Sequence, residues 1–273
     1  MNVDMERALK SLRKLRTAMK DLSGDTSPEQ IHRLRTQARR LEAIVHALSP
    51  AEANARRLLK MVKPVRKASG KVRDMDVLLA KLFDLSSEGA EEAHEAQEAP
   101  KAKVRLGEHL ARVREQHLDR LCRVVERRRK PVRRLTKRYS RDLKKQEVAG
   151  SGFSPAACQV LLAELEHWPK LHEENLHEFR IRAKTLRYML QLSPNVEPAH
   201  MEALTATKDA TGDWHDWLEL GQMASEVLDG EADRDLLRRI EDVTHDKLRI
   251  ALTTANGLRT AMFRRRQHAR RAA

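Results

Sequence analysis

Two rows of basic side chains have the spacing of one face of an α-helix, and they are the residues of this sequence best suited to bind an anion. Residues three and four positions apart on a helix lie about 5 to 6 Å from each other. Arginine offers a planar fork to two phosphate oxygens, and lysine offers a point charge. The rows therefore predict two tracks that a chain of multiply charged anions can follow. They are His32, Arg35 and Arg39 in the first, and His177, Arg180 and Lys184 in the second.

Each row follows an apolar stripe by one residue, and both stripes recur 145 residues later. The apolar positions are Ile31, Leu34, Ala38, Leu41 and Val45 in the first copy, and Leu176, Phe179, Ala183, Leu186 and Leu190 in the second. One residue turns a helix by about 100°, so the basic rows flank the buried face. Ordinary solvated helix faces are the alternative explanation. The duplication of both stripes favours a shared function.

Histidine and aspartate accompany the basic rows. We expect the neighbouring arginines to lower the pKa of His32 and His177, because like charges oppose protonation, and bound phosphate to raise it again. A packed, hydrogen-bonded histidine is the alternative. The segments that begin at Gly70 and Gly212 resemble each other, and each carries an aspartate four residues later. Asp74 and Asp216 would orient the arginine and histidine donors, although a salt bridge at a helix end fits equally well.

The sequence favours binding over catalysis. His215 and Asp216 form a pair of possible metal ligands, but the sequence shows no convincing set of further ligands, and the arginines would repel a cation. It also has no phosphate-binding glycine loop, no dinucleotide turn, and no serine or cysteine beside a recognisable base. We therefore predict no catalytic residues, no metal and no cofactor.

Two further groups of basic residues could extend the phosphate contacts. Lys60, Lys63 and Lys67 are spaced three and four apart, and Lys208 follows Lys63 by 145 residues. Arginines of a long basic helix share one face, and both groups could instead be solvated surface. Those arginines include Arg127 and Arg134.

The composition, the spacing of apolar residues and the positions of helix-breaking residues predict an all-α chain. The 273 residues carry a net charge of +14, only 3% are aromatic, and apolar residues recur at three and four positions. Residues 101–145 hold 18 basic and 5 acidic residues, a net charge of +13, whereas 86–100 is acidic and reads as a mobile loop. Pro64 and Pro131 should kink their helices without ending them. The expected helices are roughly 3–22, 28–48, 51–85, 101–147, 155–171, 173–192, 198–229 and 231–267.

The internal repeat predicts two pseudo-symmetric halves of four helices each, residues 1–147 and 151–273. No apolar run is long enough to cross a bilayer. The two cysteines cannot make a disulfide framework, and the first residues show no signal peptide. A cytoplasmic protein is therefore expected.

The motifs resemble those of the CHAD domain, the conserved-histidine α-helical domain, over essentially the whole chain. The resemblance rests on His32-x-x-Arg35-x-x-x-Arg39-Arg40, Gly70-x-x-Arg73-Asp74, His177-x-x-Arg180-x-x-x-Lys184-x-x-Arg187 and Gly212-Asp213-x-x-Asp216. It implies that the two halves are four-helix bundles that together form one domain around a basic central groove or pore. It also implies inorganic polyphosphate as the ligand, association with polyphosphate granules, and phosphate contacts from Arg40, Arg73 and Arg187 as well as from the two rows. Glu42 and Thr185 stand where the family has further basic residues.

We therefore predict a non-enzymatic protein that binds inorganic polyphosphate or another polyanion in a basic channel, where phosphate or sulfate could also bind. A nucleic-acid-binding protein is the alternative, supported by the positive charge and opposed by the few aromatic residues and the absence of a helix-turn-helix or zinc pattern. An enzyme that acts on polyphosphate is a third possibility.

Overall fold

The structure is a computed structural model of the whole chain, and it describes residues 5–22, 26–48, 53–85, 99–148, 155–192 and 196–271. These residues form an all-α fold, as predicted. The helices are α1 (Met5–Lys20), α2 (Pro28–Leu48), α3 (Ala53–Asp84), α4 (Ala99–Val148), α5 (Pro155–Glu166), α6 (Glu173–Leu190), α7 (Pro198–Val227) and α8 (Arg234–Arg271), with a 3₁₀ turn, η1 (Glu231–Asp233), before α8.

The helix boundaries follow the sequence signals closely, with one clear difference. α5 ends at Glu166 instead of 171, because Pro169 lacks an amide donor and forces the residue before it out of the helical conformation. Pro64 and Pro131 lie inside α3 and α4 and end neither helix, as expected. α4 begins at Ala99, so the last two residues of the expected loop 86–100 are helical; residues 86–98 lie outside the described part of the chain.

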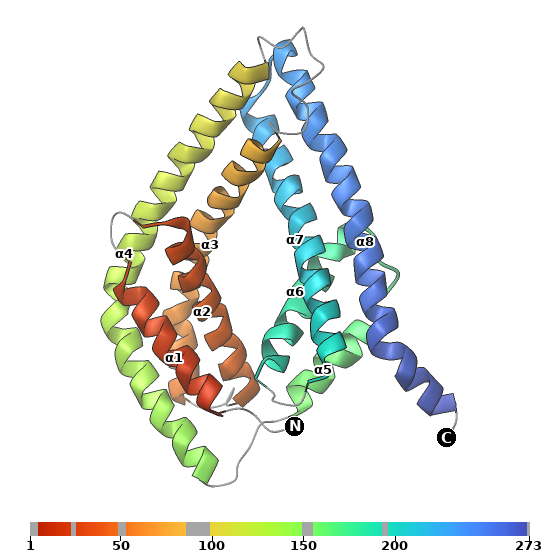
Figure 1. Cartoon of the computed structure of the whole chain (residues 1–273). Helices are drawn as coiled ribbons and strands as arrows, with labels where there is room; N and C mark the ends of the chain where they lie inside the picture. The colour runs from red at the N-terminus through yellow and green to blue at the C-terminus, as the bar shows by residue number, and fades with distance from the viewer. Residues whose placement is uncertain are drawn as a thin grey trace.

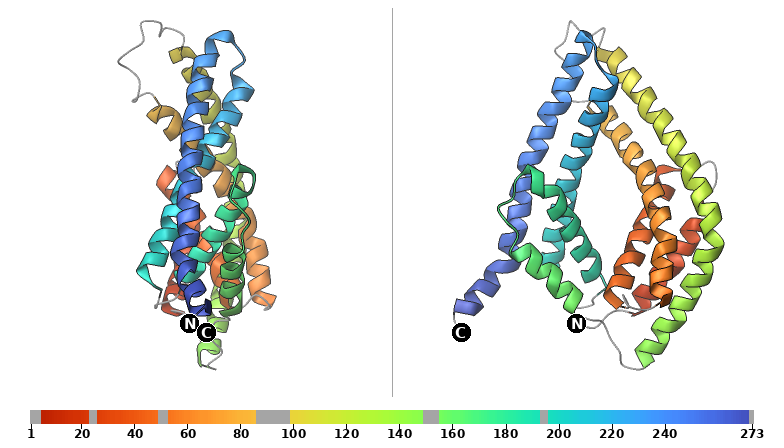
Figure 2. Two further views of the ribbon diagram at one scale, coloured as in Figure 1. Left: turned by 90° about the vertical axis from the view of Figure 1, so that its right-hand side faces the viewer. Right: turned by 180° about the vertical axis from the view of Figure 1, so that it is seen from behind.

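The two sets of four helices lie on opposite sides of the molecule (Figure 1). α1 to α4 make one side and α5 to α8 the other, and the long pairs α3–α4 and α7–α8 converge at one end, which we call the apex. The view from behind in Figure 2 shows the same arrangement. α2 contacts α5 and α6, and α3 contacts α7. The second and sixth helices, which carry the basic rows, are thereby held close to each other.

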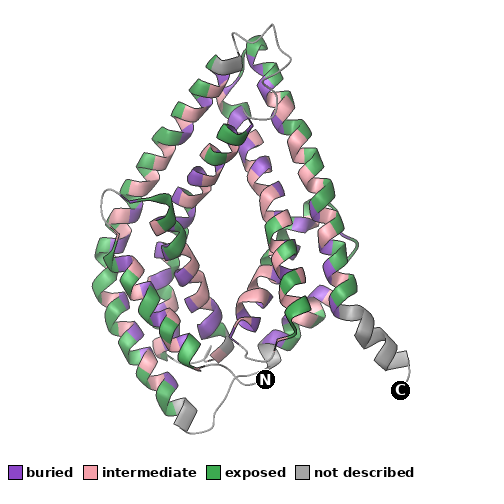
Figure 3. Cartoon of the chain, viewed as in Figure 1, coloured by how far each residue is buried: buried purple, intermediate pink, exposed green. Residues whose placement is uncertain are grey.

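Burial of the repeated apolar stripes confirms their role as the core. Every member of both stripes is buried, and those of α2 are fully inaccessible to solvent. Buried residues from both sides of the molecule belong to one continuous hydrophobic cluster. Figure 3 shows buried positions recurring along the helices between exposed ones. Because each basic residue follows a buried position, the core fixes the direction in which the basic rows face.

The apex has a second hydrophobic cluster and a set of ion pairs that join the two sides. Leu78 and Leu82 of α3 pack in one cluster with Trp217 and Leu220 of α7. Lys81 of α3 forms an ion pair with Asp213 of α7. Other pairs join α8 and η1 to the same region: Lys247 lies 3.0 Å from Asp213, and Arg105 Nη2 donates to Asp233 Oδ2 over 2.6 Å.

Within the described residues, no helix combines the length and the apolar character that a membrane span requires.

Candidate anion-binding site

Two arginines occupy matching places against two glycines, one on each side of the molecule. A Cβ atom at Gly70 would overlap Nη1 of Arg35, and a Cβ at Gly212 would lie 3.5 Å from Nη2 of Arg180. The missing side chain of each glycine therefore lets an arginine of the adjacent helix lie close to the backbone. This contact explains why the sequence pairs an arginine row with a glycine in both copies.

The next positions in each row place half-buried basic side chains opposite one another. Burial, followed by repulsion from Arg35, lowers the pKa of Arg39 to about 10. Burial and repulsion from Arg39 and Arg180 lower the pKa of Lys184 to about 6. Because these residues come from α2 and α6, the two sides contribute to one positive region. The Nε atoms of Arg39 and Arg180 are buried and have no hydrogen-bond partner among the described residues.

The histidines at the head of the rows are only partly covered by neighbouring residues, and a third histidine joins one of them. Burial of the ring lowers the pKa of His32, with Arg73 and Lys208 as further causes. Burial and then Arg180 lower the pKa of His177. The direction confirms the sequence prediction, although burial is a larger cause than the arginines. The ring of His215 lies 4.6 Å from that of His177, centroid to centroid. Burial and Arg180 lower the pKa of His215 to about 4.

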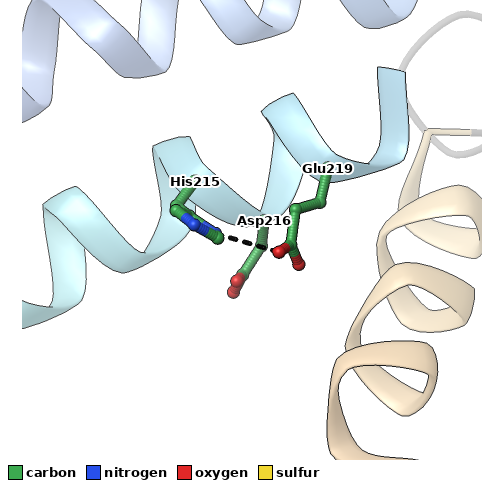
Figure 4. Close-up of side chains that lie close together, drawn as sticks. All are labelled: His215, Asp216 and Glu219. Carbon is green, nitrogen blue, oxygen red and sulfur yellow. Dashed lines mark ion pairs between the residues drawn. The ribbon is translucent and has the colours of Figure 1, made fainter. Parts of the chain in front are cut away.

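Three carboxylates lie beside the arginines. Asp74 Oδ1 is 3.3 Å from Arg35 Nη2. This ion pair agrees with one of the two interpretations of the sequence, in which the aspartate orients an arginine donor. Asp216 has no ion pair or hydrogen bond with another described residue, and burial raises its pKa. Burial, followed by repulsion from Asp74 and Asp216, raises the pKa of Glu219 to about 7. Figure 4 shows His215, Asp216 and Glu219 extending from the same side of α7.

A basic groove continues from Arg35 and Arg39 across α3 to α4. Its volume is about 720 Å³. The predicted residues Lys63 and Lys67 line it, together with further basic residues that extend the row along α3 and add α4. The cationic ones are Lys60, Arg66, Lys71 and Arg120, and His117 lies among them. The lysines of α3 therefore continue the arginine row of α2 along one groove.

The remaining predicted residues of α2, α3, α6 and α7 lie around this centre with different partners. Arg40 lines a separate groove of about 310 Å³ with Arg7 and Lys10. Arg73 is half-buried near His32. Arg187 Nε donates to Thr205 Oγ1 over 3.0 Å. Lys208, which is close enough to His32 and Lys184 to lower the pKa of both, is paired with Asp209.

The structure places Arg127 and Arg134 apart from this centre. Both are exposed on α4, and Arg134 lines another groove, with Lys130 and Lys137. α4 packs through Val125 and Val132, among other buried residues. A residue two positions further along a helix is turned by about 200°, so both arginines face away from the packed side.

Sequence reasoning missed several residues that the structure brings to the centre. Glu219 follows His215 by four residues, a helical spacing that could have identified it. Lys71 continues the lysine row by one further turn, and His117 and Arg120 have no signal before α4 is placed. Glu42 and Thr185, at positions where the family has basic residues, have other partners. Glu42 accepts a hydrogen bond from Arg66 Nε over 2.7 Å, and Thr185 Oγ1 donates to the Ile181 carbonyl.

Comparison with known proteins gives one family and several similar structures, including the following two. The family model of the CHAD domain matches residues 6–225. The crystal structure of the CHAD domain from the plant Ricinus communis has a TM-score of 0.62 at 16% identity, and the match covers 95% of this chain and 89% of the other. PptA from Streptomyces chartreusis has a TM-score of 0.62 at 15% identity, with coverage of 96% and 99%. No curated protein matched the chain. At these identities the two structures support the fold alone.

Proposed function

This chain belongs to the CHAD domain family, and on that premise we propose that it binds inorganic polyphosphate in a basic channel between the two sets of four helices. The cationic residues of α2 and α6 hold one phosphate chain between them, and the lysines of α3 extend its path. The protein acts as a binding module that associates with polyphosphate granules.

Uncompensated positive charge at the meeting point of α2 and α6 is the observation that carries the proposal. Arg35, Arg39 and Arg180 are all close enough to Lys184 to lower its pKa, and Arg35 also lowers the pKa of Arg39 and of Arg180. Close burial of like charges is unfavourable unless a counter-charge accompanies them. The described carboxylates offset it only in part, because Asp74 alone forms an ion pair with one of these four residues. A polyanion supplies the missing negative charge at several points at once.

The lysine groove supports a chain rather than a single phosphate. A groove of about 720 Å³ begins at Arg35 and Arg39 and reaches α4, so phosphates beyond those at the arginines also meet cations. Each phosphate that a protein neutralises releases condensed counterions, and affinity then falls steeply with salt concentration. We expect the affinity for long polyphosphate to have a strong salt dependence.

The chemistry at the site supports binding without catalysis. Burial raises the pKa of both thiols, Cys122 and Cys158, which makes them poor nucleophiles at neutral pH. The positive residues surround the proposed phosphate path without a described serine or cysteine paired to a base. Incubation of the protein with polyphosphate and Mg²⁺ should leave orthophosphate at the level of a protein-free control; a release that scales with protein concentration would instead establish an enzyme.

A double charge reversal tests the proposal. Arg35→Glu with Arg180→Glu should weaken polyphosphate binding by at least about 100-fold, because two charge-assisted contacts are replaced by repulsion. The matched control is Arg127→Glu with Arg134→Glu, which changes the charge equally on the exposed face of α4 and should alter affinity by no more than about threefold. Circular dichroism should show unchanged helix content in both. Equal losses in the two variants would contradict a specific channel.

Nucleic-acid binding is a second candidate because of a basic groove elsewhere on the molecule. This groove, of about 560 Å³, lies between α1 and α4 and is lined by Arg16, Lys20, Arg129, Arg133 and Lys137, among others. Competition between long-chain polyphosphate and duplex DNA at physiological salt separates the two functions. Our proposal predicts that polyphosphate displaces DNA and that DNA does not displace polyphosphate.

A further inference from the structure

His215, Asp216 and Glu219 bring three different metal-binding groups together on one helix. One ligand atom of each lies within 4.8 Å of the others, and Nδ1 of His215 is 3.7 Å from Oε1 of Glu219. All three are half-buried. Figure 4 shows their side chains on one side of α7, with the imidazole and the Glu219 carboxylate facing each other. An imidazole and two carboxylates form a donor set typical of divalent transition-metal sites.

The other half of the molecule shows that the fold does not require this set. Counting from Gly70 and Gly212, the positions that correspond to His215, Asp216 and Glu219 are Arg73, Asp74 and Val77. Only the aspartate is common to both halves. The second half therefore has histidine and glutamate where the same scaffold accepts a cation and an apolar side chain. A structural role shared by the two halves cannot account for these two residues.

The partners of the two carboxylates are also incomplete. Asp216 forms no ion pair or hydrogen bond among the described residues, whereas its counterpart Asp74 pairs with Arg35. The ion-pair partner of Glu219 is His215, and no arginine or lysine pairs with Glu219 among the described residues. Half-buried carboxylates without such a partner are unfavourable, and they are concentrated at functional sites.

We propose that His215, Asp216 and Glu219 bind one divalent transition-metal cation, with Mn²⁺ as the probe, at the edge of the polyphosphate channel. Neutral imidazole is a good ligand for such ions, and carboxylates suit Mn²⁺ in particular. Three protein ligands leave coordination positions open for water or for phosphate oxygens.

Nearby charges predict that metal and phosphate bind cooperatively. Arg35 and Arg180 lie close enough to His215 to lower its pKa, and as cations they oppose a metal ion. Asp74 lies on the opposite helix and favours one, since its charge raises the pKa of Glu219. Phosphate bound to the arginines removes their repulsion and offers oxygens to the metal. This coupling rests on the proposed function, whereas metal binding itself does not.

The test is a titration of the full chain with MnCl₂ in the absence of phosphate. Isothermal titration calorimetry and the electron paramagnetic resonance signal of free Mn²⁺ measure the binding. A pH near 8 lies above the pKa of about 7 of Glu219, so the carboxylate is charged. We expect one Mn²⁺ per chain. The variant His215→Arg with Glu219→Val copies the corresponding residues of the first half. It should fold, because the first half has these residues in the same positions. Its Mn²⁺ affinity should be at least about tenfold lower than that of the wild type.

Two further variants control for folding and surface binding. His215→Ala with Glu219→Gln is a second way to remove the ligands and should have the same effect. Glu241→Gln with His245→Ala changes an exposed pair at the same four-residue spacing on α8 and should bind Mn²⁺ like the wild type. Absence of Mn²⁺ binding in the wild type, or wild-type binding in both site variants, would overturn the metal site.

A parallel titration with polyphosphate in EDTA keeps the two proposals separate. Polyphosphate binding without metal, together with a failed Mn²⁺ titration, would leave the proposed function intact and remove the metal site. Mn²⁺ binding without polyphosphate binding would do the reverse. Cooperativity requires that Mn²⁺ raise polyphosphate affinity in the wild type more than in His215→Arg with Glu219→Val, and an equal increase would contradict it.

Discussion

The two halves of the molecule share an arginine that lies against a glycine and differ in what surrounds it. In the first half, Arg35 pairs with Asp74, and a row of four lysines continues along α3. In the second half, Asp216 has no such pair among the described residues, and carboxylates take the place of three of the four lysines. Counting from the glycines, Lys60, Lys63, Lys67 and Lys71 correspond to Glu202, Thr205, Asp209 and Asp213.

This difference assigns distinct roles to positions that the repeat makes equivalent. The arginine and glycine are retained because the close contact between α2 and α3, or between α6 and α7, needs both. The lysines of the first half face solvent and extend the proposed phosphate path. Lys184 and Glu219 of the second half are partly shielded from solvent and have strongly shifted pKa values. Counted from the glycines, the counterpart of Lys208 is Arg66, although the offset of 145 residues pairs it with Lys63.

Substitutions that make the first half resemble the second should have the largest effect on the affinity for a long polyphosphate chain. Lys63→Thr with Lys67→Asp copies Thr205 and Asp209 and should lower polyphosphate affinity by about 30-fold. The plot of log affinity against log salt concentration should become shallower by about 1.5, because two phosphate contacts are lost. Filter-binding titrations at several salt concentrations measure both. Lys144→Thr with Lys145→Asp makes the same charge change at the end of α4, and an equal response there would show that only net charge matters.

The glycines should respond unequally to the same substitution. Gly70→Ala places a Cβ where Nη1 of Arg35 lies, so the arginine must move, and affinity should fall by about tenfold. Gly212→Ala leaves 3.5 Å to Arg180 and should change affinity by less than about twofold. Both substitutions should leave the free energy of unfolding unchanged or raise it by up to about 1 kcal/mol, because alanine favours helix. Equal affinities of the two variants would mean that the arginine contacts do not matter for binding.

Much of this organisation can be predicted from the sequence because it depends on periodicity. The apolar stripes of α2 and α6, the eight helices and the flanking basic rows all follow from helical spacing. The distribution of charge across the interface does not, because it depends on which helices meet. Arg127 and Arg134 have the same residue type and spacing as contact residues, but α4 turns them outward. Glu219 has no visible role until α7 places it beside His215 and opposite Asp74.

A smaller effect should distinguish the halves by pH. Lys184 has a pKa of about 6 without ligand, and bound phosphate should raise it. At a pH between the pKa of Lys184 in the free protein and its pKa in the complex, phosphate binding takes up a proton. The affinity therefore falls as the pH rises, by about fivefold between pH 7 and 8. Deprotonation of His32, His177 and Glu219 acts in the same direction. Lys184→Arg keeps its charge and should flatten the profile, whereas Lys63→Arg in the first half should leave it unchanged. An unchanged profile in Lys184→Arg would exclude proton uptake at this lysine.

Isothermal titration calorimetry with a short polyphosphate chain tests the central claim, that both halves bind one chain, most directly. Our account predicts one chain per protein and predicts that Arg35→Gln and Arg180→Gln each weaken that single binding event. Two chains per protein, with each substitution abolishing one of them, would contradict it and would indicate a separate phosphate site in each half.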